Sequence, residues 1–233
     1  MKAGNVAAGS TPAARTSSVV YVEIVRAVGV EPAATFPAFM DLDPFLGPVE
    51  PLPERPSALF VGVLERYKDV DGLADAWRLA APRLPGARLR IVGTGSRAHV
   101  VERLVRDLPG RVDWTPVLPN EEIAALLDGV TVLVLPSRSE GLGRIVVEAL
   151  CRGRPVVATR VGGITDLVRD CENGLLVGPR DPAALAGALE RVLTDGALAA
   201  RLAAAARSSV EPWISTPEDY ARRTRELVER VRR

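Results

Sequence analysis

Short apolar runs alternate with longer amphipathic stretches along most of the chain. Six runs predict strands, at 58–63, 88–93, 112–114, 130–136, 155–160 and 173–178. Stretches with helical spacing follow them, at 71–84, 97–108, 121–128, 142–153, 163–170 and 182–195. The runs VLVL and PVVA lack polar alternation, which is typical of strands covered on both faces. The alternation predicts parallel strands joined by right-handed crossovers, and hence a doubly wound, six-stranded α/β domain over 58–210.

The two ends of the chain have a different pattern. Eight of the 19 prolines fall within the first 56 residues, and repeated proline disfavours long helices and central strands. We therefore expect a disordered tail at 1–18. Residues 19–30 predict one short helix or strand, and 31–57 predict an extended linker. At the other end, the helical patterns at 196–209 and 217–233 predict helices, and 211–233 is assigned to a separate C-terminal helix.

Composition excludes several classes of protein. Thirty basic and 29 acidic residues leave a formal net charge of +1, which argues against a broad nucleic-acid surface. No apolar run approaches the roughly 18 residues that a membrane span needs. Two cysteines are too few for a disulfide framework, so a reduced, cytoplasmic setting fits. Only two of the basic residues are lysines, Lys2 and Lys68, which makes the internal Lys68 a candidate functional residue.

In doubly wound sheets, ligands bind in loops at the carboxyl ends of the strands. The loop after the fourth predicted strand contains Glu140, Gly141 and Gly143, and Glu148 follows about two turns along the next helix. The glycines let the backbone approach a ligand, and the amides at a helix start suit a phosphate or a sugar hydroxyl. Ionised carboxylates accept hydrogen bonds from vicinal diols. The alternative is that Glu140 is a surface cap and Glu148 a solvated helix position.

The loops after the first two strands offer further candidates. In the first, Gly62 permits a tight turn, and Arg66 and Lys68 can reach an anionic group above the sheet. In the second, residues 93–98 have the form G-x-G-x-x-A, with Asp113 twenty residues beyond Gly93. This is the form of a dinucleotide-binding fingerprint, but on the second βα unit, and it leaves the Glu140–Glu148 segment without a role.

Two weaker patterns are read as structural. Asp41-Leu42-Asp43 has the D-x-D form of a metal–nucleotide site but lies in the predicted linker, directly before Pro44. His99, the single histidine, is expected to be a packing or surface residue.

The segment EGLGRIVVEALCRGRPVVATRVGGITDLVRDCENGLLV resembles the E-x7-E segment of the family-four retaining glycosyltransferases, which have the two-domain GT-B fold. The resemblance runs from about Ala58 to Tyr220 and includes VGVLERYKDVDGLADAW, RLRIVGTGS and VLVLPSRSEG. It implies that 58–210 is the C-terminal, Rossmann-like domain that binds the donor, and that 19–57 is a remnant of the acceptor domain with the interdomain linker.

The resemblance also implies roles for particular residues. Glu140 would hold the donor sugar, Glu148 the ribose hydroxyls, and the amides of Gly141, Leu142 and Gly143 the sugar or diphosphate.

Lys68 would neutralise the diphosphate, Val117 would touch the base, and Gly62 and Gly93 would complete the donor-binding set. The family usually has Arg directly after the first loop's glycine, where this chain has Val63, so Arg66 would supply the missing charge.

The function that follows is transfer of a hexose-type sugar from a nucleoside-diphosphate sugar, with retention and without a metal or other cofactor. Expected partners are the donor, an acceptor (glycan, lipid or small molecule) and a partner chain that supplies the acceptor domain. Peripheral membrane contact stays open, and no nucleic acid is expected. The alternatives are a catalytically incomplete remnant that binds a donor or a partner, and an NAD-binding oxidoreductase domain.

Overall fold

The computed structural model describes residue 29 and residues 39–231, and within them a single parallel sheet forms the centre of the fold. The strands are β1 (Ser57–Val61), β2 (Arg88–Val92), β3 (Val112–Thr115), β4 (Val132–Leu135), β5 (Val156–Thr159) and β6 (Gly174–Val177). Their order is β3-β2-β1-β4-β5-β6. The winding therefore reverses between β1 and β4, which pair through Ala58 with Val132 and Leu59 with Leu133. The six predicted strands are confirmed.

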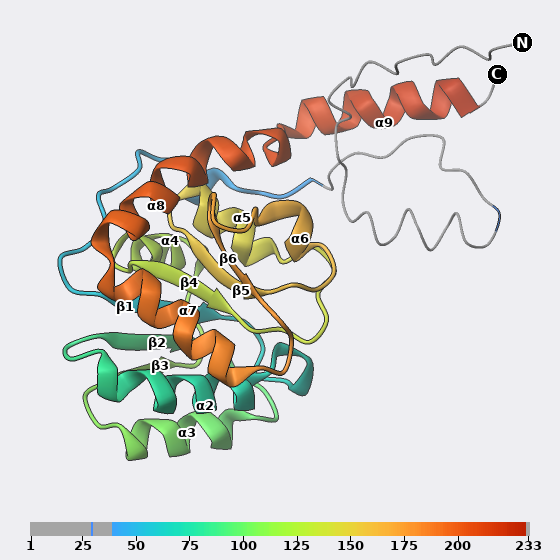
Figure 1. Ribbon diagram of the computed structural model, residues 1–233. Helices are drawn as coiled ribbons and strands as arrows, with labels where there is room; N and C mark the ends of the chain where they lie inside the picture. The colour runs from blue at the N-terminus through green and yellow to red at the C-terminus, as the bar shows by residue number, and fades with distance from the viewer. Residues whose placement is uncertain (1–28, 30–38, 232–233) are drawn as a thin grey trace, which may run out of the picture.

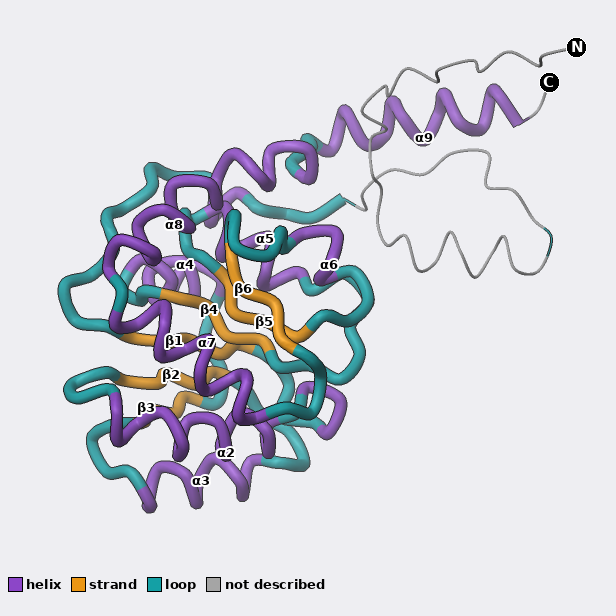
Figure 2. Tube along the Cα trace, in the orientation of Figure 1, coloured by secondary structure: helices purple, strands orange, loops and turns teal. Residues whose placement is uncertain are grey.

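Helices cover the sheet on both faces (Figures 1 and 2). They are α2 (Val70–Ala80), α3 (Ala98–Asp107), α4 (Asn120–Asp128), α5 (Arg144–Cys151), α6 (Ile164–Leu167), α7 (Pro182–Thr194) and α8 (Gly196–Val210). Helix α2 packs against α3 and α7, whereas α5 packs against α4, α6 and α8. Every residue of β4 and β5 is buried, as their unbroken apolar runs predict. The predicted doubly wound α/β architecture is confirmed.

Helix α6 is much shorter than the predicted 163–170. It ends at Leu167 because Val168 has an extended backbone. The next N–H group, that of Arg169, donates a hydrogen bond of 2.8 Å to the side-chain oxygen Oδ1 of Asn173 and not to a helix carbonyl. Local side-chain hydrogen bonds of this kind compete with helix continuation.

The proline-rich segment before β1 is only partly the extended linker that its sequence predicts. Residues Asp43–Phe45 form a 3-10 turn, and Phe45 and Leu42 are buried against the domain. Beyond the turn the chain is extended, and fully buried Arg154 donates to the carbonyl oxygens of Pro51 (3.2 Å) and Glu50 (2.6 Å). The linker is therefore fixed to the domain by apolar anchors and a buried guanidinium. The prediction for 1–18, the prediction for 19–30 apart from residue 29, and the part of the linker prediction at 31–38 lie outside the described residues.

At the C-terminal end, a 3-10 turn (Glu211–Trp213) follows α8 and leads into α9 (Pro217–Val231). Helix α9 projects away from the body of the domain (Figure 1). Its first turn is tied back by Tyr220, whose ring centroid lies 6.2 Å from that of Phe39. None of the helices in the described part of the chain has the length and apolar character required to span a membrane.

Candidate functional site

The loops after β1 and β4 meet where the winding of the sheet reverses. Lys68 Nζ lies 2.6 Å from Glu140 Oε2, and the two side chains are only 11% and 12% exposed. The Ser137 hydroxyl donates to the same carboxylate oxygen at 3.0 Å. Crevices at such reversal points are where doubly wound sheets bind ligands. The structure thus brings together two of the residues that the sequence analysis selected, from loops 72 residues apart.

Lys68 is held by the short segment between β1 and α2. Residues Arg66–Lys68 form a single 3-10 turn, and Nζ lies 5.5 Å from the centroid of the Tyr67 ring. The Cε atom passes over Gly62, where an added Cβ would make ordinary contact at 3.7 Å. Gly62 therefore leaves space for the lysine stem, but close packing does not require glycine there.

The Glu140 loop rests on the loop after β5, a support that the sequence analysis missed. A Cβ at Gly162 would overlap the carbonyl oxygen of Glu140, and one at Gly163 would overlap that of Gly141. The Gly163 N–H donates to the Gly141 oxygen at 3.0 Å, and the Thr159 hydroxyl donates to the Ser137 oxygen. The detectable signal was the Gly-Gly pair directly beyond the fifth strand.

The chain bends at Gly143, which adopts the left-handed conformation (φ 74°) and caps the start of α5. Helix α5 begins at Arg144, two residues later than the predicted start, because a left-handed residue cannot be part of the helix. Gly143 itself is buried, and Leu142 is half-buried beside exposed Gly141.

Glu148 is buried, so the alternative of a solvated helix position is wrong. Its residue is 5% exposed, and burial raises the pKa of its carboxyl group. Arg144, one turn earlier on α5, donates from Nε to Oε1 at 2.6 Å and acts in the opposite direction on that pKa. A largely desolvated carboxylate with one partner on its own helix retains capacity to accept further hydrogen bonds.

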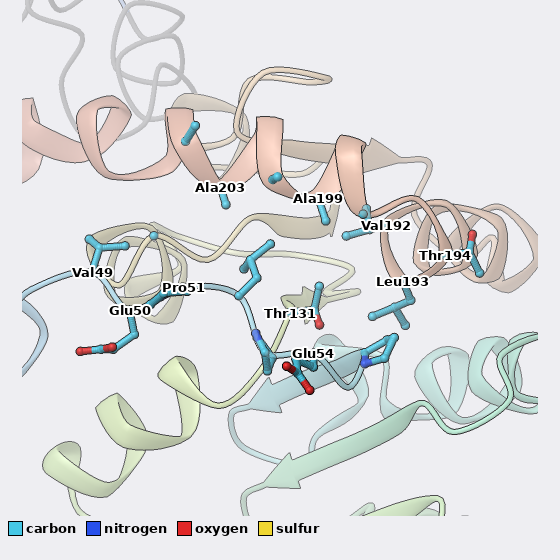
Figure 3. A pocket seen from close by; sticks show the side chains of 17 residues that line it. Val49, Glu50, Pro51, Glu54, Thr131, Val192, Leu193, Thr194, Ala199 and Ala203 are labelled. Atoms are coloured by element: carbon cyan, nitrogen blue, oxygen red, sulfur yellow. The ribbon is translucent and has the colours of Figure 1, made fainter.

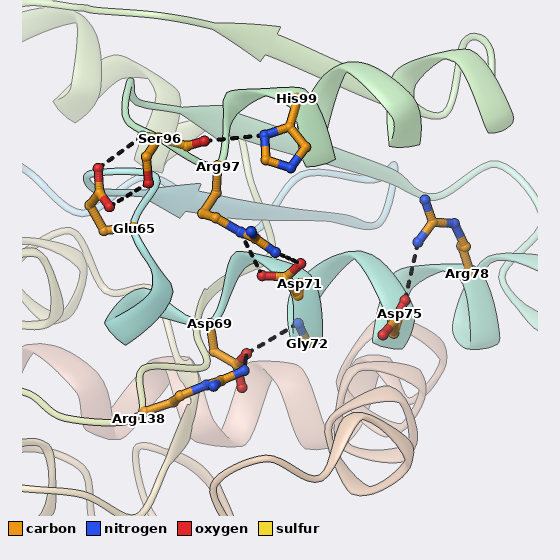
Figure 4. Close-up of polar contacts among 10 residues, drawn as sticks. All are labelled: Glu65, Asp69, Asp71, Gly72, Asp75, Arg78, Ser96, Arg97, His99 and Arg138. Carbon is orange, nitrogen blue, oxygen red and sulfur yellow. Dashed lines mark hydrogen bonds and ion pairs between the residues drawn. The ribbon is translucent and has the colours of Figure 1, made fainter.

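The G-x-G loop after β2 packs closely against the loop after β1 (Figure 4). A Cβ at Gly93 would overlap the carbonyl oxygen of Gly62, and one at Gly95 would crowd the backbone of Leu64. The Leu64 N–H donates to the Thr94 oxygen at 2.7 Å. These two glycines are thus explained by close packing between loops, without a dinucleotide.

Glu65 completes the junction between these two loops. Its carboxylate accepts from the Ser96 N–H at 2.8 Å and from the Ser96 hydroxyl at 2.6 Å. These hydrogen bonds favour the ionised form and lower the pKa of Glu65. His99 is exposed, with Nδ1 3.1 Å from the Ser96 carbonyl oxygen, in line with its expected surface role.

Other predicted residues stay apart from the Lys68–Glu140 pair. Arg66 is exposed, and its side chain has no hydrogen bond or ion pair with any residue that the structure describes. Val63, which stands where the family usually has Arg, is 46% exposed, and Val117 on the loop between β3 and α4 is 73% exposed. Asp41 and Asp43 lie on the linker, and within the described ranges no cluster of three or more His, Cys, Asp or Glu could hold a metal ion.

A hollow of about 590 Å³ lies at the opposite, amino-terminal end of the strands (Figure 3). The linker around Pro51, Thr131 just before β4, and the faces of α7 and α8 around Leu193 and Ala203 line it. Neither Lys68 nor Glu140 reaches this hollow. The charged groups and the hollow are therefore separate features at opposite ends of the sheet.

Comparisons with known proteins agree with this architecture. A family model described as glycosyl transferases group 1 matches residues 55–195. The chain is 43% identical over 152 residues to a D-inositol 3-phosphate glycosyltransferase of Acidothermus cellulolyticus, covering 59% of this chain and 33% of that relative. The chain thus spans about a third of the length of this curated relative.

Two solved structures have a similar fold. Sucrose-phosphate synthase from Thermosynechococcus elongatus superposes with a TM-score of 0.72 at 29% identity, over 90% of this chain and 56% of that one. Anabaena HepE, solved with UDP and glucose, superposes with a TM-score of 0.73 at 20% identity, over 91% of this chain and 62% of that one. The chain therefore belongs to the glycosyl transferases group 1 family, as the resemblance of its Glu140–Glu148 segment predicts, and it provides a Rossmann-like domain of the GT-B type.

Proposed function

We propose that this domain binds the nucleoside diphosphate of a sugar-nucleotide donor at the carboxyl ends of β1 and β4, as the donor-binding half of a retaining, metal-independent glycosyltransferase. The observation that carries the proposal is the Lys68–Glu140 pair, which places a cation and a carboxylate 2.6 Å apart at the carboxyl ends of the strands, where the sheet reverses its winding. The UDP and glucose bound by the similarly folded Anabaena protein support a nucleotide sugar as the ligand class.

In this proposal Lys68 exchanges its carboxylate partner for the donor diphosphate. The lysine is then the main compensating charge for the leaving group, and Arg66, which is exposed in the same 3-10 turn, adds a second cation. Glu140, released from the ion pair, accepts hydrogen bonds from the donor sugar. The amides of Gly141, Leu142 and Gly143 face the same ligand at the start of α5.

The nucleoside extends from this point. Buried Glu148 accepts from the ribose hydroxyls, for which its second carboxylate oxygen is available beside the Arg144 contact. Val117, 73% exposed on the loop after β3, lies against the base. Gly93 lets the loops after β1 and β2 lie close together beneath the diphosphate, and Gly62 leaves space for the Lys68 stem.

The chemistry follows from charge development. The bond between the anomeric carbon and the diphosphate oxygen breaks, the bond from that carbon to the acceptor oxygen forms on the same face, and the leaving phosphate takes the acceptor's proton. Negative charge grows on the leaving group, and preorganised donors such as Lys68 stabilise it; the loss of one such donor costs about 3 kcal/mol in other enzymes. The proposal assigns the acceptor site to a second domain, since the match covers a third of the Acidothermus relative.

Calorimetric titration of UDP-, GDP- and ADP-sugars into the purified chain tests the proposal. We expect one of the three series to bind, with affinity reduced at least tenfold by Lys68→Gln and by Glu148→Ala. Arg78→Gln is the matched control, because Arg78 pairs with Asp107 on the outer surface of α2 and α3. Absence of binding in all three series, or equal affinities in wild type and both site variants, contradicts the proposal.

A further inference from the structure

A second ion pair joins the same two loops behind the Lys68–Glu140 pair. Arg138, two residues before Glu140, donates from Nη2 to Asp69 Oδ1 at 2.6 Å, and Asp69 directly follows Lys68. The Arg138 backbone N–H also donates to the Tyr67 carbonyl oxygen at 2.7 Å. Arg138 therefore forms hydrogen bonds with the residues directly before and after Lys68 in the chain.

The Asp69 end of this pair has an unusual backbone. Asp69 is in the left-handed conformation (φ 51°, ψ 47°), which costs free energy in any residue other than glycine. Its carboxylate, 4% exposed, also caps α2 by accepting from the Gly72 N–H at 3.3 Å. A Cβ at Gly72 would come within 2.8 Å of Asp69 Oδ2, so Gly72 makes room for this carboxylate (Figure 4).

The Arg138 end also carries a cost. Its Nε is buried and has no hydrogen-bond partner among the described residues, although most buried donors in proteins are paired. Strained backbone persists only where the surrounding structure holds it in place, and it clusters at active sites and ligand clamps. A buried unpaired donor in a native structure likewise calls for an explanation. Here both occur in one pair, and that pair joins the loops that carry Lys68 and Glu140.

We infer that Arg138, acting through Asp69, is a positioning residue that sets the location of Lys68 for the donor diphosphate. The inference rests on the proposed function. When the diphosphate draws Lys68 away from Glu140, the ion pair between these two side chains is lost. The Arg138–Asp69 pair keeps the lysine backbone fixed relative to the Glu140 loop at that moment, so the ammonium group stays over the site of the diphosphate.

Binding of nucleotides that differ by one phosphate separates positioning from mere stabilisation. UDP, GDP and ADP, each with its monophosphate, are titrated into wild type, Arg138→Gln, Asp69→Gly and the double variant. Asp69→Gly accepts the left-handed backbone while it removes the carboxylate. We expect the preference for the diphosphate over the monophosphate to fall about five- to tenfold in each single variant, as for a weakened hydrogen bond to a charged group. Monophosphate affinity should change less than twofold.

The double variant tests whether Arg138 acts through Asp69. It should lose no more than the single variants, because either substitution alone already breaks the pair. Arg138→Lys, which keeps the cation, should recover at least half of the lost preference. Arg78→Gln serves as the control, because Arg78 pairs with Asp107 at a similar side-chain exposure of 31% but away from the site.

Two results overturn the inference and differ from each other. If wild type binds a diphosphate and Arg138→Gln leaves the diphosphate preference unchanged, or weakens both nucleotides equally, Arg138 has only a structural role and the proposed function stands. If wild type binds none of the three diphosphates, both the inference and the proposed function are wrong.

Discussion

Replacing Glu140 with glutamine should tighten the binding of a nucleoside diphosphate that carries no sugar. Glu140 pairs with Lys68 at 2.6 Å, and its negative charge repels an incoming diphosphate. The substitution keeps the side-chain shape and removes the charge, so Lys68 becomes available to the phosphate. The affinity for the free diphosphate should rise because Glu140 competes with the diphosphate for Lys68, even though Glu140 is itself proposed to bind the donor sugar.

The magnitude follows from the burial of the pair. Exposed ion pairs contribute about 0–1 kcal/mol, and breaking a fully buried one costs about 3–5 kcal/mol. The two side chains are 11% and 12% exposed, and the amide oxygen introduced by Glu140→Gln would still accept a hydrogen bond from Lys68. We therefore expect Glu140→Gln to make the free energy of diphosphate binding more favourable by about 1–2 kcal/mol, which is roughly a five- to thirtyfold gain in affinity.

Calorimetry with UDP, GDP and ADP, and with the corresponding sugar nucleotides, measures the effect. In Glu140→Gln the free diphosphate should bind more tightly, whereas the additional affinity contributed by the sugar should be lost. Glu190→Gln is the control, because Glu190 forms an ion pair with Arg83 on the distant surface at 2.9 Å. An unchanged or weaker affinity for the free diphosphate refutes the argument that Glu140 competes for Lys68.

Three further predictions concern packing and protonation. Gly93→Ala should destabilise the fold by about 3 kcal/mol, because the added Cβ would overlap the Gly62 oxygen. Gly187→Ala, in open space on α7, should stabilise the fold by about 0.5–1 kcal/mol. Thermal unfolding measures both effects, and equal shifts in the two variants would contradict the packing argument. Burial raises the pKa of Cys151 to about 11, so at pH 8 a thiol reagent should modify exposed Cys171 rapidly and Cys151 only on unfolding. Rapid modification of both thiols in the folded protein would be evidence against the burial of Cys151. Burial raises the pKa of Glu148, so the native state keeps this proton to higher pH than the unfolded chain does, and the stability of the fold should decrease as the pH rises from the ordinary carboxyl pKa through the raised pKa. Glu148→Gln should lack this pH dependence, and parallel curves of stability against pH for wild type and variant would disprove it.

Regular packing made the sheet predictable from the sequence. Each strand lies within two residues of its apolar run because buried parallel strands need continuous branched side chains. The strand order of such a fold then places the first and fourth loops together. Lys68 and Glu140 were selected separately, each from a loop at the carboxyl end of a strand, and the family resemblance gave both a role at the donor.

Contacts that join distant loops could not be predicted in the same way. Asp69 and Arg138 are 69 residues apart and no pattern in the sequence pairs them, and the Gly162–Gly163 support depends on how closely two loops approach. The anchoring of the linker by Phe45 and Arg154 was missed because a high proline content indicates only what the segment cannot form. The left-handed conformation of Gly143 at the start of α5 is one that glycine permits but does not require.

The most direct test of the central claim is a crystal structure of the chain with a bound nucleoside diphosphate. The account predicts the phosphates at the carboxyl ends of β1 and β4, with Lys68 Nζ within hydrogen-bonding distance of a phosphate oxygen and the Lys68–Glu140 contact broken. A diphosphate held by residues 93–98 or in the hollow beside Pro51 and Ala203, with that ion pair intact, would contradict it.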